Sequence, residues 1–129
     1  MTASRAAASA PLPAELRDHI DRWAETWLRR FSRGLELRAA DPGPFNYPVS
    51  VFSQWRGRSF YLGATYRTPS RNPDDDFVVR TARLTPTGFG RFDLAYFRHT
   101  GRWCTVACGR TANQCIAEIE QNELFWPVI

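Results

Sequence analysis

The chain has 129 residues, 43% of them hydrophobic and 23% charged, with a formal net charge of +4. These values are ordinary for a globular protein of one domain. No stretch approaches the ~18 consecutive apolar residues that a membrane-spanning helix needs. The composition therefore excludes a helical membrane protein, and it also excludes a low-complexity or strongly acidic chain.

All seventeen cationic side chains are arginine, and they are interleaved with five tryptophans, four tyrosines and nine phenylalanines. Arginine binds phosphate and carboxylate bidentately and stacks on aromatic rings, which lysine does not do. A GC-rich genome also favours arginine codons, and we attribute the absence of lysine mainly to that cause. The arginines therefore have to be assigned one at a time, from their positions in the fold.

Residues 1–12 are predicted to form a flexible N-terminal arm, and residues 13–129 a single domain. The arm lacks the apolar run of ~7 residues that a secretion signal needs, and three cysteines are an odd number for a disulfide framework. We therefore expect a cytoplasmic protein. Cys104 and Cys108 would lie about 13 Å apart along a strand, too far to share one zinc ion. We predict buried cysteines, no metal and no cofactor.

The segment from Pro11 to Gly34 has the periodicity of an amphipathic helix. Apolar residues recur at steps of three and four, which places them on one face that we expect to be core. These residues are Leu16, Ile20, Trp23, Trp27, Leu28 and Phe31. Gly34 is the expected end of the helix, because glycine commonly follows the last helical turn.

After this helix the pattern changes to short extended runs separated by turn residues. The predicted strands are residues 35–39, 47–56, 59–67, 77–85, 91–99 and 102–108. A final helix is expected to begin at Thr111, where Gln114 completes a capping box. The apolar tail that follows should dock on the domain. The predicted fold is α+β, an antiparallel meander sheet of five or six strands flanked by a long N-terminal and a short C-terminal helix.

The two turns of the second half predict how the last three strands pair. A two-residue turn at Thr100 and Gly101 places Phe97 opposite Cys104. A five-residue loop at 86–90 places Arg83 opposite Asp93, as a cross-strand ion pair. One sheet face is then almost wholly apolar and is the expected core. Its residues are Phe77, Val79, Thr81, Ala95, Phe97, Cys104, Val106 and Cys108.

The other predicted face carries the candidate binding site. It places Arg80 beside Tyr96 and Arg98 beside Trp103, with Arg102 and Arg110 nearby. Residues 77–112 hold six arginines and one acidic residue. Single-strand binders stack bases on aromatic rings and meet phosphates with arginine, so we predict single-stranded nucleic acid as the ligand. Two other interpretations remain open: the arginines stack on rings within the chain, or the N-terminal helix covers this face.

A protein partner or a second copy of the chain is the alternative ligand, because tyrosine, tryptophan and arginine are also enriched at protein interfaces. The chain would then be an accessory protein of the antitoxin or immunity kind. Catalysis is not expected. His19 and His99 are the only histidines, and neither has a nucleophile within reach in the predicted fold.

The order of these features resembles a family of small bacterial proteins known only as a domain of unknown function. The similarity lies in the amphipathic N-terminal helix, the strand Val49-Ser50-Val51-Phe52, the hairpin strand Leu94-Ala95-Tyr96-Phe97, the segment Gly101-Arg102-Trp103 and the closing pair Phe125-Trp126. It covers roughly residues 15–127. The resemblance implies a fold and implies no activity, cofactor or site.

Overall fold

The computed structural model describes residues 11–129, so the part of the predicted arm at 1–10 lies outside the described residues. Two helices and a 3-10 turn begin the fold: α2 (Ala14–Leu28), η1 (Arg29–Phe31) and α3 (Ser32–Ala40). Five strands follow: β1 (Tyr47–Arg56), β2 (Ser59–Arg67), β3 (Phe77–Gly88), β4 (Arg91–Phe97) and β5 (Trp103–Thr111). The chain closes with α4 (Ala112–Gln121) and the 3-10 turn η3 (Glu123–Phe125), and a further turn, η2 (Pro73–Asp75), precedes β3.

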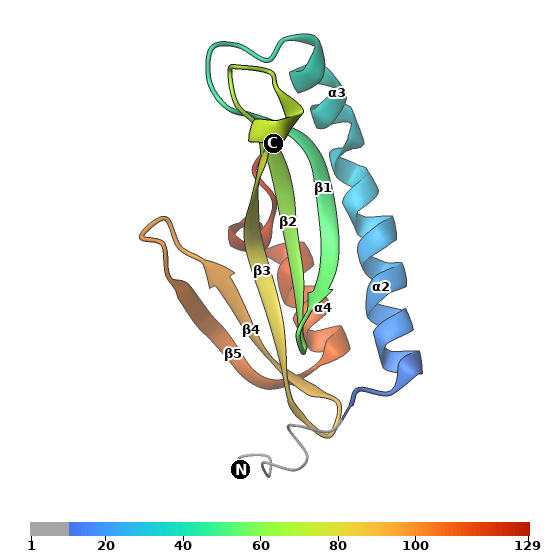
Figure 1. Cartoon of the computed structure of the whole chain (residues 1–129). Helices are drawn as coiled ribbons and strands as arrows, with labels where there is room; N and C mark the ends of the chain where they lie inside the picture. Colours follow the sequence, from blue (N-terminus) through green and yellow to red (C-terminus); the bar gives the residue numbers. More distant parts are fainter. Residues whose placement is uncertain (1–10) are drawn as a thin grey trace.

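The strands form one antiparallel sheet in the order β1-β2-β3-β4-β5, which confirms the predicted α+β meander. Figure 1 shows α2 and α3 running along β1, with α4 behind the middle of the sheet, and the β4–β5 hairpin diverging from β3. Both helices pack on the same face, where Ile20 of α2 and Ile119 of α4 are fully buried in one hydrophobic cluster with the sheet. Among residues 11–129, no helix has the length and apolar character needed to cross a bilayer.

The N-terminal helix is longer than predicted, and the strand expected at residues 35–39 is part of α3. The chain passes through η1 without leaving the helical region, so Gly34 is a helix-interior residue and not the end of the helix. A Cβ at Gly34 would lie 2.9 Å from Ile129 Cγ2, which explains the glycine by close packing of the C-terminus. The apolar stripe is confirmed: Trp27 and Leu28 are each only 8% exposed.

Both turns predicted for the second half of the chain have the wrong number of residues. The β3–β4 turn has two residues, Phe89 and Gly90, whose φ angles of 55° and 70° are those of a type I′ hairpin turn. Arg83 therefore faces Ala95, and Asp93 faces Thr85. The predicted Arg83–Asp93 ion pair is absent, because Asp93 Oδ1 instead accepts a 3.0 Å hydrogen bond from the backbone N–H of Gly109.

The β4–β5 turn has three residues instead of two. Arg98 N donates to Arg102 O at 2.8 Å, and Gly101 takes a left-handed φ of 83°. Phe97 is consequently paired with Trp103 and not with Cys104. A shift of one residue exchanges the two faces of a strand relative to its neighbour. Trp103 therefore shares a face with Phe97 and not with Tyr96.

The helix-covered face of the sheet is the one that the sequence analysis assigned to binding. Ala82, Leu84, Phe92 and Leu94 are fully buried beneath the helices. The predicted core face is instead exposed at four positions: Phe77, Phe97, Val106 and Cys108. Thr81 and Ala95 of that set are buried. The alternative interpretation, that the N-terminal helix covers the predicted binding face, is correct for these four residues, which lie in one buried cluster with residues of α2 and of α4.

The C-terminal elements follow the prediction closely. Thr111 Oγ1 accepts from Gln114 N at 3.2 Å while Gln114 Oε1 accepts from Thr111 N at 2.9 Å, which is the expected capping box. In the tail, Phe125 is fully buried, and Trp126 Nε1 donates to the Ile119 carbonyl at 2.6 Å. Leu12, assigned to the arm, is half-buried and packs against the core.

Candidate functional site

A β-bulge in the middle of β3 decides where the site arginines point. Leu62 pairs with Ala82 but Gly63 pairs with Arg80, so Thr81 is an extra residue on β3. Without this bulge, Arg80 would lie on the same face as Ala82, beneath the helices. The extra residue turns Arg80 to the opposite face, beside Tyr61 and Arg83.

That opposite face, which no helix of residues 11–129 covers, carries two pairs in which a guanidinium group lies over an aromatic ring. The Arg83 guanidinium carbon lies 4.7 Å from the centroid of the Trp103 ring, and that of Arg80 lies 5.6 Å from the Tyr61 ring. The rings also contact each other: the centroids of Tyr61 and Trp103 are 5.8 Å apart, and those of Phe97 and Trp103 are 5.3 Å apart. We call these five residues, Tyr61, Arg80, Arg83, Phe97 and Trp103, the open-face cluster.

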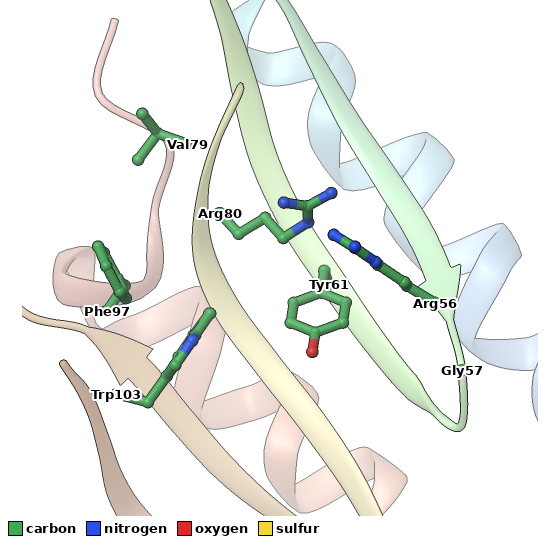
Figure 2. Close-up of a pocket in the computed structure, with 7 residues that line it drawn as sticks. All are labelled: Arg56, Gly57, Tyr61, Val79, Arg80, Phe97 and Trp103. Carbon is green, nitrogen blue, oxygen red and sulfur yellow. The ribbon is translucent and has the colours of Figure 1, made fainter. Parts of the chain in front are cut away.

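A pocket of about 530 Å³ lies against this cluster, where the β4–β5 hairpin separates from β3. Its lining residues come from all five strands and the β1–β2 turn: Arg56, Gly57, Tyr61, Val79, Arg80, Phe97 and Trp103. Figure 2 shows the guanidinium groups of Arg56 and Arg80 directed toward one another above the Tyr61 ring. The volume is within the ~300–1,000 Å³ that is typical of small-molecule sites.

The pocket is strongly positive. Of the residues that the structure describes, two arginines and no carboxylate line it. Arg80 Nη2 donates to Gln54 Oε1 at 3.1 Å, and the Nε atoms of Arg80 and Arg83 are buried with no hydrogen-bond partner. A cation that is partly removed from water with no opposite charge nearby is poorly compensated. The arrangement therefore favours an anionic ligand.

The six residues predicted to form the binding site do not lie together in the structure. Arg80 and Trp103 both line the pocket, although each has a partner other than the one predicted. Tyr96 is half-buried on the helix-covered face, where its ring packs edge-on against Phe125 with 6.0 Å between centroids. It is therefore not beside Arg80, and it is not available to stack on a base.

The other three assigned arginines lie outside the pocket. Arg98 and Arg102 are exposed at the two ends of the β4–β5 turn, next to Phe97 and Trp103 in the chain. Arg110 is exposed near the end of β5 and lines a different, smaller hollow with residues of α4, among them Glu118. Arg98 and Arg102 can extend the positive surface of the pocket, whereas Arg110 is separated from it.

Sequence reasoning missed Arg56, Tyr61, Arg83 and Phe97. The alternation in β2 does carry a signal for Tyr61, because Phe60 and Leu62 on either side of it are apolar and fully buried. A residue between two core positions faces the other side of the sheet. Arg56 and Arg83 could be placed only once the strand registers were known.

The two histidines and Cys115 are not among the residues that line the pocket. His19 Nε2 lies 2.7 Å from Asn113 Oδ1 on the helix side, and His99 is exposed in the β4–β5 turn. Burial raises the pKa of the Cys115 thiol to about 11, so this cysteine is protonated and unreactive at neutral pH. Within residues 11–129, no three His, Cys, Asp or Glu side chains converge to hold a metal ion.

The acidic loop of residues 68–76 is held by hydrogen bonds among its own residues and to Arg67. Asp76 forms a bidentate pair with Arg67, with Nε–Oδ1 and Nη2–Oδ2 distances of 3.0 and 2.9 Å. Ser70 Oγ donates to Asp75 Oδ2 at 2.9 Å. This loop precedes β3, and none of its carboxylates is among the residues that line the pocket.

The model of one protein family matches residues 10–127, nearly the whole length of the domain described above. The chain belongs to the family described as "Domain of unknown function (DUF3024)". This membership confirms the resemblance to a domain-of-unknown-function family. Searches of curated proteins and of solved structures found no match.

Proposed function

We propose that this DUF3024 protein is a non-catalytic cytoplasmic protein that binds single-stranded nucleic acid on the open-face cluster. The observation that carries the proposal is the pairing of Arg80 with Tyr61 and of Arg83 with Trp103 on the sheet face opposite the helices of residues 11–129. Bases stack on aromatic rings with little dependence on sequence, while arginines follow the phosphates. Both kinds of group are present here within one patch.

The intramolecular stacking of the arginines is compatible with this role. A guanidinium group that lies over a ring can still donate its N–H groups to other acceptors. Stacking also restricts the side chain, so that less conformational entropy is lost when a phosphate binds. The pairs Arg80–Tyr61 and Arg83–Trp103 therefore act as positioned donors, and the exposed side of each ring remains a stacking surface.

The distribution of charge over the sheet supports an anionic partner. The five strands contain six arginines and a single acidic residue, Asp93. Asp93 accepts a hydrogen bond from the backbone N–H of Gly109. The strands therefore present an excess of positive charge, and Arg98 and Arg102 add to it at the hairpin end. Such an excess attracts a polyanion and raises its rate of association.

The test is fluorescence anisotropy with a labelled single-stranded oligonucleotide across a salt series. About five phosphate contacts predict a slope near −3.5 for log K against log salt concentration. Trp103→Leu should weaken binding by about 5- to 150-fold, because stacking contributes ~1–3 kcal/mol per base. Arg83→Gln should weaken binding and reduce the slope by about 0.7.

Arg29→Gln is the matched control, because it removes the same charge from an exposed position in η1, on the helix side. It should leave both the affinity and the slope nearly unchanged. Circular dichroism and thermal unfolding confirm that each variant is folded. Equal losses for Arg83→Gln and Arg29→Gln would indicate a general charge effect, and absence of binding at low salt would reject the proposal.

A second copy of the chain is the alternative partner, and one observation favours it. β5 is the last strand of the sheet, and its Val106 and Cys108 are exposed. An uncovered edge strand can pair with the same strand of another molecule. Light scattering after size-exclusion chromatography measures the mass directly. A dimer that Val106→Arg dissociates would support this alternative, and a monomer would reject it.

A further inference from the structure

We propose that the pocket between Arg56 and Arg80 binds a nucleotide through a terminal phosphate monoester, with the base against Trp103 and Phe97. The inference rests on the proposed function, because it assigns a specific subsite to the same face. Two kinds of molecule carry a terminal phosphate monoester: a free nucleoside monophosphate and the phosphorylated end of a single strand. An internal phosphodiester is the alternative that the experiment must separate from both.

The first argument is the approach of two cations. Arg56 ends β1 and Arg80 lies in the middle of β3, yet Figure 2 shows their guanidinium groups directed toward one another across Tyr61. Like charges repel, and the repulsion is stronger where water is partly excluded. An anion between the two groups converts this repulsion into two attractions. Each guanidinium group can also donate two parallel hydrogen bonds to phosphate oxygens.

The second argument is that one of the two arginines is held in place before a ligand arrives. Arg80 is half-buried, contacts the Tyr61 ring and donates through Nη2 to Gln54 Oε1 at 3.1 Å. Arg56 is exposed, and no described carboxylate lies within ion-pair distance of it. A donor that is already held in place, opposite one that is exposed to solvent, lowers the entropic cost of binding an anion between them.

The third argument concerns the charge of the ligand. A phosphate monoester carries about −1.5 to −2 at pH 7 because its second pKa is near 6, whereas an internal phosphodiester or a carboxylate carries one negative charge. Two arginines without a carboxylate match the doubly charged group. The pocket volume of about 530 Å³ is also within the range of small-molecule sites.

The ring side of the pocket provides the surface for the base. Trp103 and Phe97 contact each other at 5.3 Å between centroids, and Phe97 is 39% exposed. Both residues flank the β4–β5 turn, on the side of the pocket away from Arg56. A nucleotide with its phosphate at the arginines can therefore direct its base toward these rings. Stacking on a tryptophan ring is tolerant of base identity, so we expect little preference among the four bases.

The experiment measures binding by titration calorimetry. One short oligonucleotide is tested in three forms: with a 5′-phosphate, with a 3′-phosphate, or with hydroxyl groups at both ends. Free nucleoside 5′-monophosphates and nucleosides are tested in the same way. The phosphorylated strand should bind about 10-fold more tightly than the hydroxyl form, and the monophosphates more tightly than the nucleosides, because hydrogen bonds to charged groups contribute ~1.5–3 kcal/mol. The advantage should diminish between pH 7.5 and 5.5, as the monoester takes up a proton.

Arg56→Gln and Arg80→Gln should abolish the phosphate advantage, and Arg29→Gln should retain it. Arg56 is exposed, so its variant tests the proposal even if Arg80→Gln impairs folding. Equal binding of phosphorylated and hydroxyl strands would overturn this inference and leave the proposed function standing. Binding of free monophosphates without binding of any strand would support the pocket and reject the single-strand function. Binding of neither would reject both.

Discussion

Thr81 Oγ1 donates a 2.7 Å hydrogen bond to the backbone carbonyl of Phe125, between two buried residues 44 positions apart in the chain. Thr81 is also the extra residue of the β3 bulge. The bond therefore ties the strand irregularity to the C-terminal turn η3. Because the bulge turns Arg80 to the open face, the orientation of a pocket arginine depends on how the C-terminal segment is docked.

Replacing Thr81 with valine should lower the free energy of unfolding by about 1–3 kcal/mol, since the Phe125 carbonyl would lose its donor in a buried site. Denaturant unfolding followed by fluorescence measures the change. Thr105→Val is the matched control, because Thr105 is exposed on β5. A loss at Thr81 no greater than that at Thr105 would contradict a structural role for this bond.

Gly63→Ala should destabilise the sheet by about 3 kcal/mol, the upper end of the usual cost of overpacking. A Cβ there would meet the Val79 carbonyl oxygen and would lie 2.8 Å from Phe52 Cζ, and a backbone carbonyl cannot rotate away. Gly101→Ala is the comparison. Its position has open space but a φ of 83°, so only a conformational cost of about 1 kcal/mol applies. Unfolding curves that rank the two variants in the opposite order would refute this reading of the β2–β3 contact.

The three cysteines should react with a thiol reagent at very different rates at pH 8. Cys108 is exposed and should react first, whereas Cys115 is 1% exposed, and its raised pKa of about 11 keeps the thiol protonated. Peptide mapping after labelling identifies the modified residues. Cys115 should become reactive only when the protein is unfolded with denaturant, and rapid labelling of Cys115 in the native protein would be inconsistent with its burial.

The Arg67–Asp76 pair should contribute to the acid dependence of stability. The hydrogen bonds from Arg67 hold the pKa of Asp76 below its ordinary value. A group whose pKa is lowered by folding stabilises the protein above its unfolded pKa, and this contribution is lost as the pH falls through the folded pKa. The difference in stability between wild type and Asp76→Asn should be largest at neutral pH and should shrink in acid. Asp74→Asn, which removes an exposed carboxylate in the same loop, should show no such trend.

Most of the fold followed from periodicity and turn chemistry. The apolar stripe around Trp27, the capping box at Thr111 and the alternating strands are local patterns, and the structure confirms them. Gly34 misled the prediction, because its role is to admit Ile129 from the opposite end of the chain. That reason is not visible in the residues around Gly34, so a helix stop was the natural interpretation.

The site was predicted only in part. The physical cause is that side chains alternate between the two faces of a strand, so an error of one residue moves a side chain to the other face. Arg80 and Trp103 were identified, but one extra residue at Thr81 and one extra residue in the β4–β5 turn placed each of them on the other face. The bulge is stabilised by a bond to Phe125, which is a contact between distant segments. A single sequence does not specify such contacts, so the face of each arginine could not be derived from alternation alone.

The meander topology has a consequence for how the chain folds. Each strand pairs only with its sequence neighbours, so every step of sheet assembly closes a short loop at low entropic cost. The contacts across long separations join α2 to α4 and to the tail, for example the hydrogen bond from Trp23 to Glu120 and the edge-to-face packing of Trp126 on Trp27 at 5.6 Å between centroids. We expect the hairpins to be formed in the folding transition state and the tail to dock afterwards. Substitutions at Trp126 should then accelerate unfolding and leave the refolding rate nearly unchanged.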